Sequence, residues 1–425
     1  MKSTKQIFLN IKERLIQERI KRISTDLNST NAITVAVAFN ELRRLRDRWH
    51  TQEAIKALSH PEEFLVISAI KYLAAISYPL ESKDVEPLLK KGERIKKESV
   101  SLFPHMSMMD GCRMLSLTLE DSSPAVRIKS LKILDKMGCE EAIKKAKKLT
   151  EDPDVQVRIE AVRSLAAAGE EVDPKIIIDV IEDPKLPFNV RSSAMKVFAG
   201  YFSGSLPLIK KLSKSTYSKI SSTAITLMGK FPCNEIWDSL KEIINDSAPV
   251  ENVEAAIKNA STCKDKKELE GMILKYVNYP SKSLKITTLK ALIILESQHV
   301  EGIIEEILDG NDRNLKISVI PFVERFPSKA NVESLLKIIE GEDEELTEKS
   351  LRVLSKLKIK DERIKQLLDG SKRIKIQALK SLIASKDIDS DELIDIFRNS
   401  DSIEVKMEAL NGIAKLFPQR LEELS

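Results

Sequence analysis

The chain has 425 residues, of which 32% are charged and 5% aromatic, and it carries a formal net charge of +4. Its 13 glycines are too few to favour a β-rich fold or a glycine-rich phosphate-binding loop. No apolar run approaches the length that spans a bilayer, and no signal-peptide pattern is evident, so we expect a cytoplasmic protein without a membrane partner. The charges are uneven, because residues 1–230 hold 39 Lys and Arg against 29 Asp and Glu, whereas residues 231–425 hold 30 against 36.

The first predicted element is an amphipathic helix over residues 4–24, in which isoleucine or leucine recurs about every four residues. We predict that residues 1–30 form an N-terminal amphipathic capping helix over the segment that follows. The alternative is a helix that docks on a partner or lies on a membrane surface, since six of its residues are basic. Glu13 and Glu18 weaken the membrane interpretation.

From residue 31 to residue 418, one amphipathic pattern returns thirteen times at intervals of 28 to 33 residues. Each copy has an anchor, with apolar residues five and eight positions later, and these offsets share one side of an α-helix. The fourth offset is mostly small, as in Ala161, which lets two helices approach closely. Self-similarity at this period is typical of a stacked repeat array, not of a compact enzyme domain. The anchors are Val37, Leu65, Ile95, Val126, Val157, Val190, Ile220, Asn252, Leu284, Leu315, Leu346, Ile374 and Val405.

Turn residues predict where the helices begin and end. Aspartate before proline, at Asp152–Pro153 and Asp183–Pro184, predicts an N-cap followed by the first helical position. Proline cannot continue a helix, so Phe-Pro pairs predict helix ends. Shorter apolar-periodic runs lie between the anchored helices, and each repeat is therefore predicted to be two antiparallel helices joined by a tight turn. The Phe-Pro pairs begin at Phe103, Phe231, Phe326 and Phe417, and the shorter runs cover 140–150, 174–182, 236–245 and 332–340.

The run from Asp152 to Leu165 resembles the short HEAT-type repeat, also called the phycobilisome-lyase-like repeat. That motif carries aspartate in the inter-helix turn and a basic residue six positions later. The resemblance implies an all-α fold, an α-solenoid of about thirteen HEAT-like helix-turn-helix repeats. It also implies a ladder of these side chains between neighbouring repeats, with gaps at Ser221 and Thr347. The matching pairs are Asp121 with Arg127, Asp152 with Arg158, and Asp369 with Lys375.

One set of residues, here called the basic column, is not explained by packing. Six positions after the anchor, nine of thirteen residues are basic and none is acidic. This offset, and a second one ten positions after the anchor, lie opposite the apolar side and so face solvent. The resemblance implies that the second helix of each pair lines the concave side, where the column would form a track on the order of 100 Å long. The basic column comprises Arg43, Lys71, Lys132, Arg163, Lys196, Lys258, Lys290, Arg352 and Lys380, and the second offset adds Lys136, Lys230, Arg325, Lys356 and Lys415.

A solvated helix face is the competing interpretation of the basic column, because exposed helix positions are often lysine. Single exposed ion pairs contribute little, so only a multivalent contact would give the column a function. The acidic cluster of Glu340 and residues 342–345 is interpreted as a solvated loop, with a contact for a basic partner as the alternative. Residues 419–425 are predicted to be a short, frayed C-terminal tail.

Motifs for catalysis and metal binding are missing from the sequence. The four histidines lie too far apart for a metal pair, and no GxGxxG, Walker or GxSxG motif occurs, so we expect no enzyme, cofactor, metal or small-molecule substrate. The four cysteines have no CxxC spacing and are interpreted as buried reduced thiols. Trp49 follows four arginines, which is a candidate group for stacking and phosphate contacts, but a structural role is favoured for it and for Trp237.

These patterns favour a non-catalytic scaffold or adaptor that binds a protein or peptide with an acidic surface along the basic concave face. The alternative is a protein that binds the phosphate backbone of nucleic acid on the same face. A net charge of +4 and the lack of interleaved aromatic residues weaken that alternative.

Overall fold

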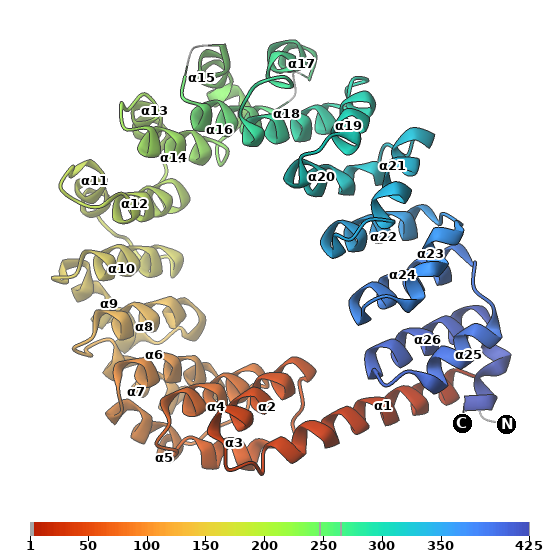
Figure 1. Cartoon of the computed structure of the whole chain (residues 1–425). Coiled ribbons are helices and arrows are strands. Elements are labelled where there is room, and N and C mark those ends of the chain that lie inside the picture. The colour runs from red at the N-terminus through yellow and green to blue at the C-terminus, as the bar shows by residue number, and fades with distance from the viewer. Residues whose placement is uncertain (1–3, 246–247, 264–265, 425) are drawn as a thin grey trace. The chain divides into compact units, whose positions relative to one another are not determined.

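The computed structural model describes residues 4–245, 248–263 and 266–424, and the regular secondary structure in those ranges is helical (Figure 1). The predicted all-α solenoid of paired helices is therefore confirmed. Residues 1–3 of the predicted cap and Ser425 of the predicted tail lie outside the described residues. The chain divides into two compact units, one of residues 20–231 and one of residues 1–19 with 232–425.

In the unit of residues 20–231, the first helix of each pair lies in one row and the second helix in another, and the second helices follow the concave side of this unit (Figure 1). Each second helix contains one predicted anchor. The elements are the end of α1 (Thr4–Asp26), α2 (Ala32–Leu45), α3 (Thr51–Ala57), α4 (Glu63–Ala75), α5 (Ser82–Val85), η1 (Glu86–Lys90), α6 (Glu93–Ser99), η2 (Val100–His105), α7 (Met108–Thr118), α8 (Pro124–Met137), α9 (Glu140–Lys148), η3 (Leu149–Glu151), α10 (Val155–Ala167), α11 (Lys175–Glu182), α12 (Phe188–Tyr201), α13 (Leu206–Ser213) and α14 (Ser218–Met228).

The unit that contains residues 232–425 repeats the same arrangement, again with the second helices on its concave side (Figure 1). Six further anchors fall in its second helices. The elements are α15 (Cys233–Asn245), α16 (Val250–Ala260), α17 (Lys266–Ile273), η4 (Leu274–Tyr276), α18 (Lys282–Leu295), α19 (Val300–Asp309), α20 (Arg313–Val319), η5 (Ile320–Glu324), α21 (Lys329–Ile339), α22 (Glu344–Leu357), α23 (Glu362–Gln366), η6 (Leu367–Asp369), α24 (Lys372–Ser385), α25 (Ser390–Asn399), α26 (Ile403–Leu416) and η7 (Pro418–Leu424).

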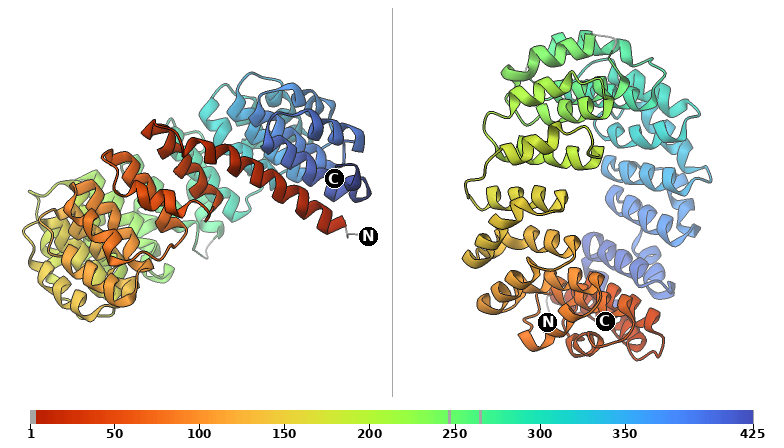
Figure 2. Two further views of the ribbon diagram at one scale, coloured as in Figure 1. Left: turned by 90° about the horizontal axis from the view of Figure 1, so that it is seen from below. Right: turned by 90° about the vertical axis from the view of Figure 1, so that its left-hand side faces the viewer.

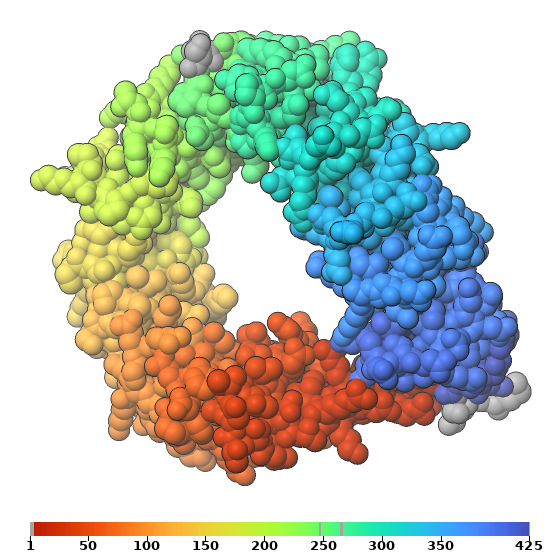
Figure 3. Space-filling model, viewed as in Figure 1, coloured from red at the N-terminus to blue at the C-terminus, as the bar shows by residue number. Residues whose placement is uncertain are grey.

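The core of each unit follows the predicted offsets. The residue five positions after the anchor is buried in every copy, and the alanine or serine at the fourth offset is buried as well. Side chains close the space between successive helix pairs within each unit (Figure 3). Val37 is an exception among the anchors, because 56% of it is exposed, as is most of Ile33 one turn earlier.

The Asp-Pro pairs do not cap helices as predicted. Asp154 is the N-cap of α10, and its carboxylate accepts hydrogen bonds from the backbone N–H groups of Gln156 and Val157 at 2.8 and 3.1 Å. Asp183 lies at the end of α11, and α12 begins five residues later, so Asp183 does not cap α12. The prediction was wrong because proline's fixed φ also suits a turn position before the helix.

Two second helices tighten into 3₁₀ geometry halfway along. The helix α6 continues as η2, which contains Pro104, and α20 continues as η5, which contains Pro321. Proline has no N–H to donate and its ring clashes with the carbonyl four residues back, so an α-helix cannot run through it unchanged. The predicted stop at Phe103–Pro104 is therefore wrong, because the helix changes to 3₁₀ geometry at Val100 and η2 runs through both residues to His105.

The two ends of the chain are ordered in the described residues. The helix α1 is one continuous helix (Figure 2). Its residue Ile20 belongs to the core of the unit of residues 20–231, whereas Arg19, in the other unit, lies 3.4 Å from Glu404. The predicted frayed tail is wrong, because η7 buries Leu421 and Leu424.

Candidate interaction surface

Basic and acidic side chains connect neighbouring repeats, as the HEAT resemblance implies. Arg127 donates from Nη2 to Asp152 Oδ1 of the next repeat at 2.8 Å, and the two side chains are only 10% and 4% exposed. Its Nη1 also donates to the Asp121 carbonyl at 2.7 Å. In the repeat before, Lys96 lies 2.9 Å from the Asp121 carboxylate. Each aspartate thus accepts from the basic residue of the preceding repeat, which fixes the stacking of the pairs.

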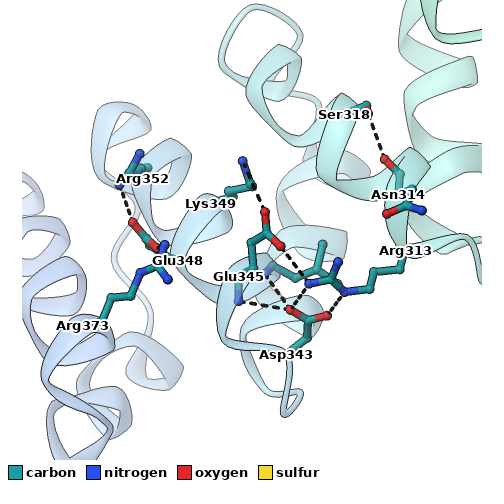
Figure 4. Close-up of polar contacts among 10 residues, drawn as sticks. Arg313, Asn314, Ser318, Asp343, Glu345, Glu348, Lys349, Arg352 and Arg373 are labelled. Carbon is teal, nitrogen blue, oxygen red and sulfur yellow. Dashed lines mark hydrogen bonds and ion pairs between the residues drawn. The ribbon is translucent and has the colours of Figure 1, made fainter. Parts of the chain in front are cut away.

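The predicted acidic loop is part of a similar connection in the other unit (Figure 4). Asp343 is the N-cap of α22 and also binds Arg313 of α20, whose Nη2 lies 2.9 Å from Glu345. The Arg313 guanidinium and the backbone N–H groups hold the pKa of Asp343 below its ordinary value. The interpretation as a free solvated loop is therefore wrong for Asp343 and Glu345, which bind across the repeat boundary.

All nine residues of the basic column lie on second helices, one to a helix. Six are exposed, whereas Arg43, Lys71 and Arg163 are half-buried. The exposed six are Lys132, Lys196, Lys258, Lys290, Arg352 and Lys380.

Two arginines of the basic column are engaged inside the protein. Arg163 Nε lies 2.5 Å from Glu160, and its Nη2 donates to Ser164 Oγ at 3.1 Å. Arg352 and Arg373 of the next repeat both bind Glu348, whose side chain is 5% exposed (Figure 4). Arg163 and Arg352 thus neutralise half-buried and buried carboxylates, so they are poor candidates for contacts with a partner.

Some residues of the second basic offset are paired inside the protein and others are not. In the unit that contains residues 232–425, Arg325 lies 2.9 Å from Glu296 and Lys356 lies 2.6 Å from Glu324. In the unit of residues 20–231, Lys136 and Lys230 are exposed and have no ion pair within the part of the chain that the structure describes. Exposed second-helix lysines of these two offsets without an ion pair among the described residues therefore lie on α8 and α12 and just after α14 of this unit, and on α16, α18, α24 and α26 of the other.

Sequence reasoning missed a hydrogen-bonded chain in the unit of residues 20–231. Ser24 Oγ lies 2.9 Å from His50 Nε2, and His50 Nδ1 lies 2.7 Å from Asp47 Oδ2. The order resembles a serine-hydrolase triad, but Ser24 already donates its one hydroxyl proton to the Ile20 carbonyl at 2.6 Å. The imidazole then donates to the serine instead of accepting from it, which is the reverse of general-base catalysis. These hydrogen-bonded side chains connect the end of α1 to the turn after α2.

Trp49 is 80% exposed in that turn, so the structural role favoured from the sequence is wrong. Asp47 beside it is buried and also accepts from Tyr72 Oη at 3.3 Å. Burial and the Asp47 carboxylate raise the pKa of Tyr72 well above its ordinary value. Trp237 is half-buried, with the Lys241 ammonium 5.8 Å from its ring centroid.

The cysteines form two disulfides, Cys112–Cys139 and Cys233–Cys263, so the prediction of reduced thiols is wrong. The first joins α7 to the residue before α9, and the second joins the start of α15 to the segment before α17. Each thus links the first helices of successive repeats. The signal was present in the sequence, because separations of 27 and 30 residues are close to one repeat and place the paired cysteines side by side.

Within residues 4–245, 248–263 and 266–424, no group of three His, Cys, Asp or Glu side chains is arranged to hold a metal ion. Over the same ranges, no helix combines the length and apolar character needed to cross a membrane.

Comparison with known proteins supports the fold. Residues 113–198 match the family model of HEAT repeats. No curated protein sequence matches the chain. Yeast importin-beta (Kap95p) is 16% identical with a TM-score of 0.54, over 99% of this chain and 70% of that one. A chain of the Kap95:Nup1 complex is 16% identical with a TM-score of 0.50, over 100% and 74%. Kap121p is 12% identical with a TM-score of 0.44, and this chain spans 54% of it.

Proposed function

We propose that this chain, an α-solenoid of HEAT repeats, is a non-catalytic scaffold whose exposed second-helix lysines bind an acidic surface of a protein or peptide. The observation that carries the proposal is the pair Lys132 and Lys196. They occupy the same helical position two repeats apart, both are exposed, and neither has an ion pair among the described residues. Lys136 and Lys230 add two further such charges one helical turn later.

The chemistry of these positions supports an anionic partner. Lysine ammonium groups on the second helices of one unit are held at fixed spacing by the repeat stack, so several weak contacts can form together. The fold is compatible with protein binding, since the Kap95:Nup1 complex contains a solenoid of similar fold. Arg163 and Arg352 are assigned to internal pairs in place of the partner contacts predicted from the sequence.

A charge-reversal experiment tests the proposal. Lys132→Glu, Lys136→Glu and Lys196→Glu are combined in one variant, and affinity for a fluorescein-labelled oligoglutamate peptide is measured at low salt. We expect a loss of about tenfold or more, because three attractive charges become repulsive. Arg163 stays unchanged, since a glutamate there would lie against Glu160 and could destabilise the fold.

The matched control reverses three exposed lysines on the first helices of the same unit, Lys144, Lys148 and Lys175. It makes the same change in net charge on the opposite row. Equal losses in both variants would show that only net charge matters and would remove the proposal. Duplex DNA is tested in parallel at several salt concentrations. If duplex DNA binds with a steep salt dependence, needs the same lysines, and the peptide does not bind, the nucleic-acid alternative replaces the scaffold.

A further inference from the structure

The turn between α2 and α3 presents an aromatic ring that the fold does not use. Trp49 is 80% exposed, the highest exposure among the large hydrophobic side chains of the described residues. An exposed tryptophan loses the stabilisation that its burial would give, roughly 25 cal/mol for each Å² of apolar surface. Its neighbours in sequence, Arg48 and His50, are exposed and half-buried, so no apolar patch continues from the ring along the turn.

Hydrogen bonds hold the backbone that carries Trp49 in a defined conformation. Asp47 Oδ2 accepts from the Trp49 backbone N–H at 3.2 Å and lies 2.7 Å from His50 Nδ1. Tyr72 Oη donates to the Asp47 carbonyl at 3.0 Å, which ties the turn to α4. Arg46 adopts the left-handed conformation with φ 53° and ends α2. These contacts fix the backbone that carries the ring before any ligand arrives, which lowers the entropy cost of ordering the turn on binding.

Cationic side chains surround this turn in the chain. Arg44, Arg46 and Arg48 are all exposed, and Arg44 is paired with Glu41 at 2.9 Å. The hydrogen bond between His50 and Ser24 brings the end of α1, with exposed Lys21 and Arg22, to the same turn. The acid within the turn, Asp47, is buried and already paired. The exposed acids of these two segments are Asp26 at the end of α1 and Glu53 in α3, fewer than the exposed cations, so cations predominate.

We propose that the Trp49 turn, residues 46–50, binds single-stranded nucleic acid, with a base stacked on the indole and phosphates bound by Arg46 and Arg48. An exposed flat ring next to exposed arginines offers both a stacking surface for a base and cations for the phosphates of a strand. A protein hot spot would instead need apolar neighbours that exclude water around the tryptophan. The proposal does not rest on the lysines of the basic column, so either can fail without the other.

The experiment uses the full-length chain with Trp237→Phe, because the protein has 2 tryptophans and this change leaves Trp49 as the sole indole emitter. A fluorescein-labelled oligothymidylate of about 15 nucleotides is titrated at low salt, and anisotropy gives the affinity. We expect quenching of the remaining indole fluorescence in parallel with binding of an unlabelled strand. Trp49→Ala in the otherwise natural chain should weaken binding about tenfold or more, and Trp49→Phe should retain most of it.

Charge variants test the phosphate contacts separately. Arg48→Gln and Arg46→Asn should each flatten the slope of log affinity against log salt by about 0.7, the value for one phosphate of a single strand. Asparagine is chosen at position 46 because it tolerates the left-handed backbone there. The melting temperature of each variant should equal that of the natural chain, because Trp49, Arg46 and Arg48 are exposed.

Three results would overturn the proposal. One is no binding of the single strand at low salt, and another is binding that Trp49→Ala leaves unchanged. The third is oligoglutamate peptide that quenches Trp49 fluorescence while the single strand does not, which would make the turn a protein contact. The triple reversal of Lys132, Lys136 and Lys196 is the matched control, since it should leave quenching of Trp49 by the oligothymidylate in place.

Discussion

Small residues set how closely neighbouring second helices approach. Ala161 of α10 is fully buried, and α10 packs against α8 and α12. We expect Ala161→Leu to destabilise the protein by about 1–3 kcal/mol, because the added methylene groups have no space and force the helices apart. Thermal unfolding followed by circular dichroism measures the effect. Ala166→Leu, near the end of the same helix and half-buried, is the control, and an equal melting temperature for Ala161→Leu and the natural chain would contradict the packing.

A carboxylate near the end of the chain predicts a specific pH dependence. A hydrogen bond from Lys372, opposed in part by desolvation, lowers the pKa of Glu404 from 4.5 to about 2. The folded state therefore binds this proton less readily than the unfolded state, and the stabilisation is present above pH 4.5 and lost as the pH falls through 2. In Glu404→Gln the melting temperature should fall less between neutral pH and about pH 2 than it does in the natural chain.

The control for that measurement is Glu301→Gln, at an exposed carboxylate without an ion pair in the described part of the chain. It should keep the pH dependence of the natural chain. If the two variants behave alike, the pairing of Glu404 with Lys372 at 2.8 Å does not persist in solution.

At the residue scale, the sequence predicted what depends on helical periodicity and missed what depends on contacts between distant residues. The apolar offsets and the small fourth offset are buried as expected, because a 3.6-residue period determines them. The pairing of His50 with Asp47 and the exposure of Trp49 depend on how α1 and α4 meet one turn, and no periodicity reports that. Arg163 and Arg352 share the helical position of Lys132 and Lys196, yet a neighbouring glutamate binds each of them.

At the scale of elements, the two disulfides connect successive first helices and should stabilise the array. They close loops of 27 and 30 residues, and restricting loops of that length in the unfolded chain contributes about 3.6 kcal/mol each in the chain-entropy description. We expect reductant to lower the melting temperature, and Cys139→Ser with Cys263→Ser to reproduce the loss and to remove the response to reductant. Peptide mapping without reduction should recover both linked pairs.

Four thiols that react with iodoacetamide in the native, unreduced protein would contradict this prediction. The cytoplasmic location expected from the sequence is also harder to reconcile with the disulfides, because thiols in most cytosolic proteins are kept reduced.

The thirteen anchored helices could be predicted because each copy repeats the others. The caps and the 3₁₀ segments could not, because Asp-Pro and Phe-Pro pairs suit turns, caps and tightened helices alike.

At the scale of the whole molecule, the repeat period predicted the fold class but not the division into two units. One boundary of the units falls between residues 231 and 232 of the chain, where the anchored pattern continues without interruption. The sequence does change in charge at nearly the same place, from an excess of Lys and Arg in residues 1–230 to an excess of Asp and Glu afterwards. Charge could have indicated the boundary, whereas hydrophobic periodicity could not.

In a chain whose repeats pack only on their neighbours, a destabilising substitution should affect only its own repeat and the adjacent ones. The stability of such an array is close to a sum of repeat and nearest-neighbour terms, so strain in one repeat has no common core through which to spread. We expect Ala161→Leu to speed amide hydrogen exchange in α8, α10 and α12 and to leave α18, α22 and α24 as protected as in the natural chain. Hydrogen exchange followed by mass spectrometry measures both groups of helices at once.

The equivalent substitution in the other unit provides a second, independent test of this prediction. Ala378 of α24 is the equivalent alanine in the unit that contains residues 232–425, and it is also fully buried. Ala378→Leu should speed exchange in α22, α24 and α26 and spare α8, α10 and α12, which is the opposite pattern from the same chemical change. If either substitution speeds exchange evenly along the described helices, the chain unfolds as one cooperative body. The repeats would then be coupled far beyond their nearest neighbours, and a one-dimensional stack would not describe this protein.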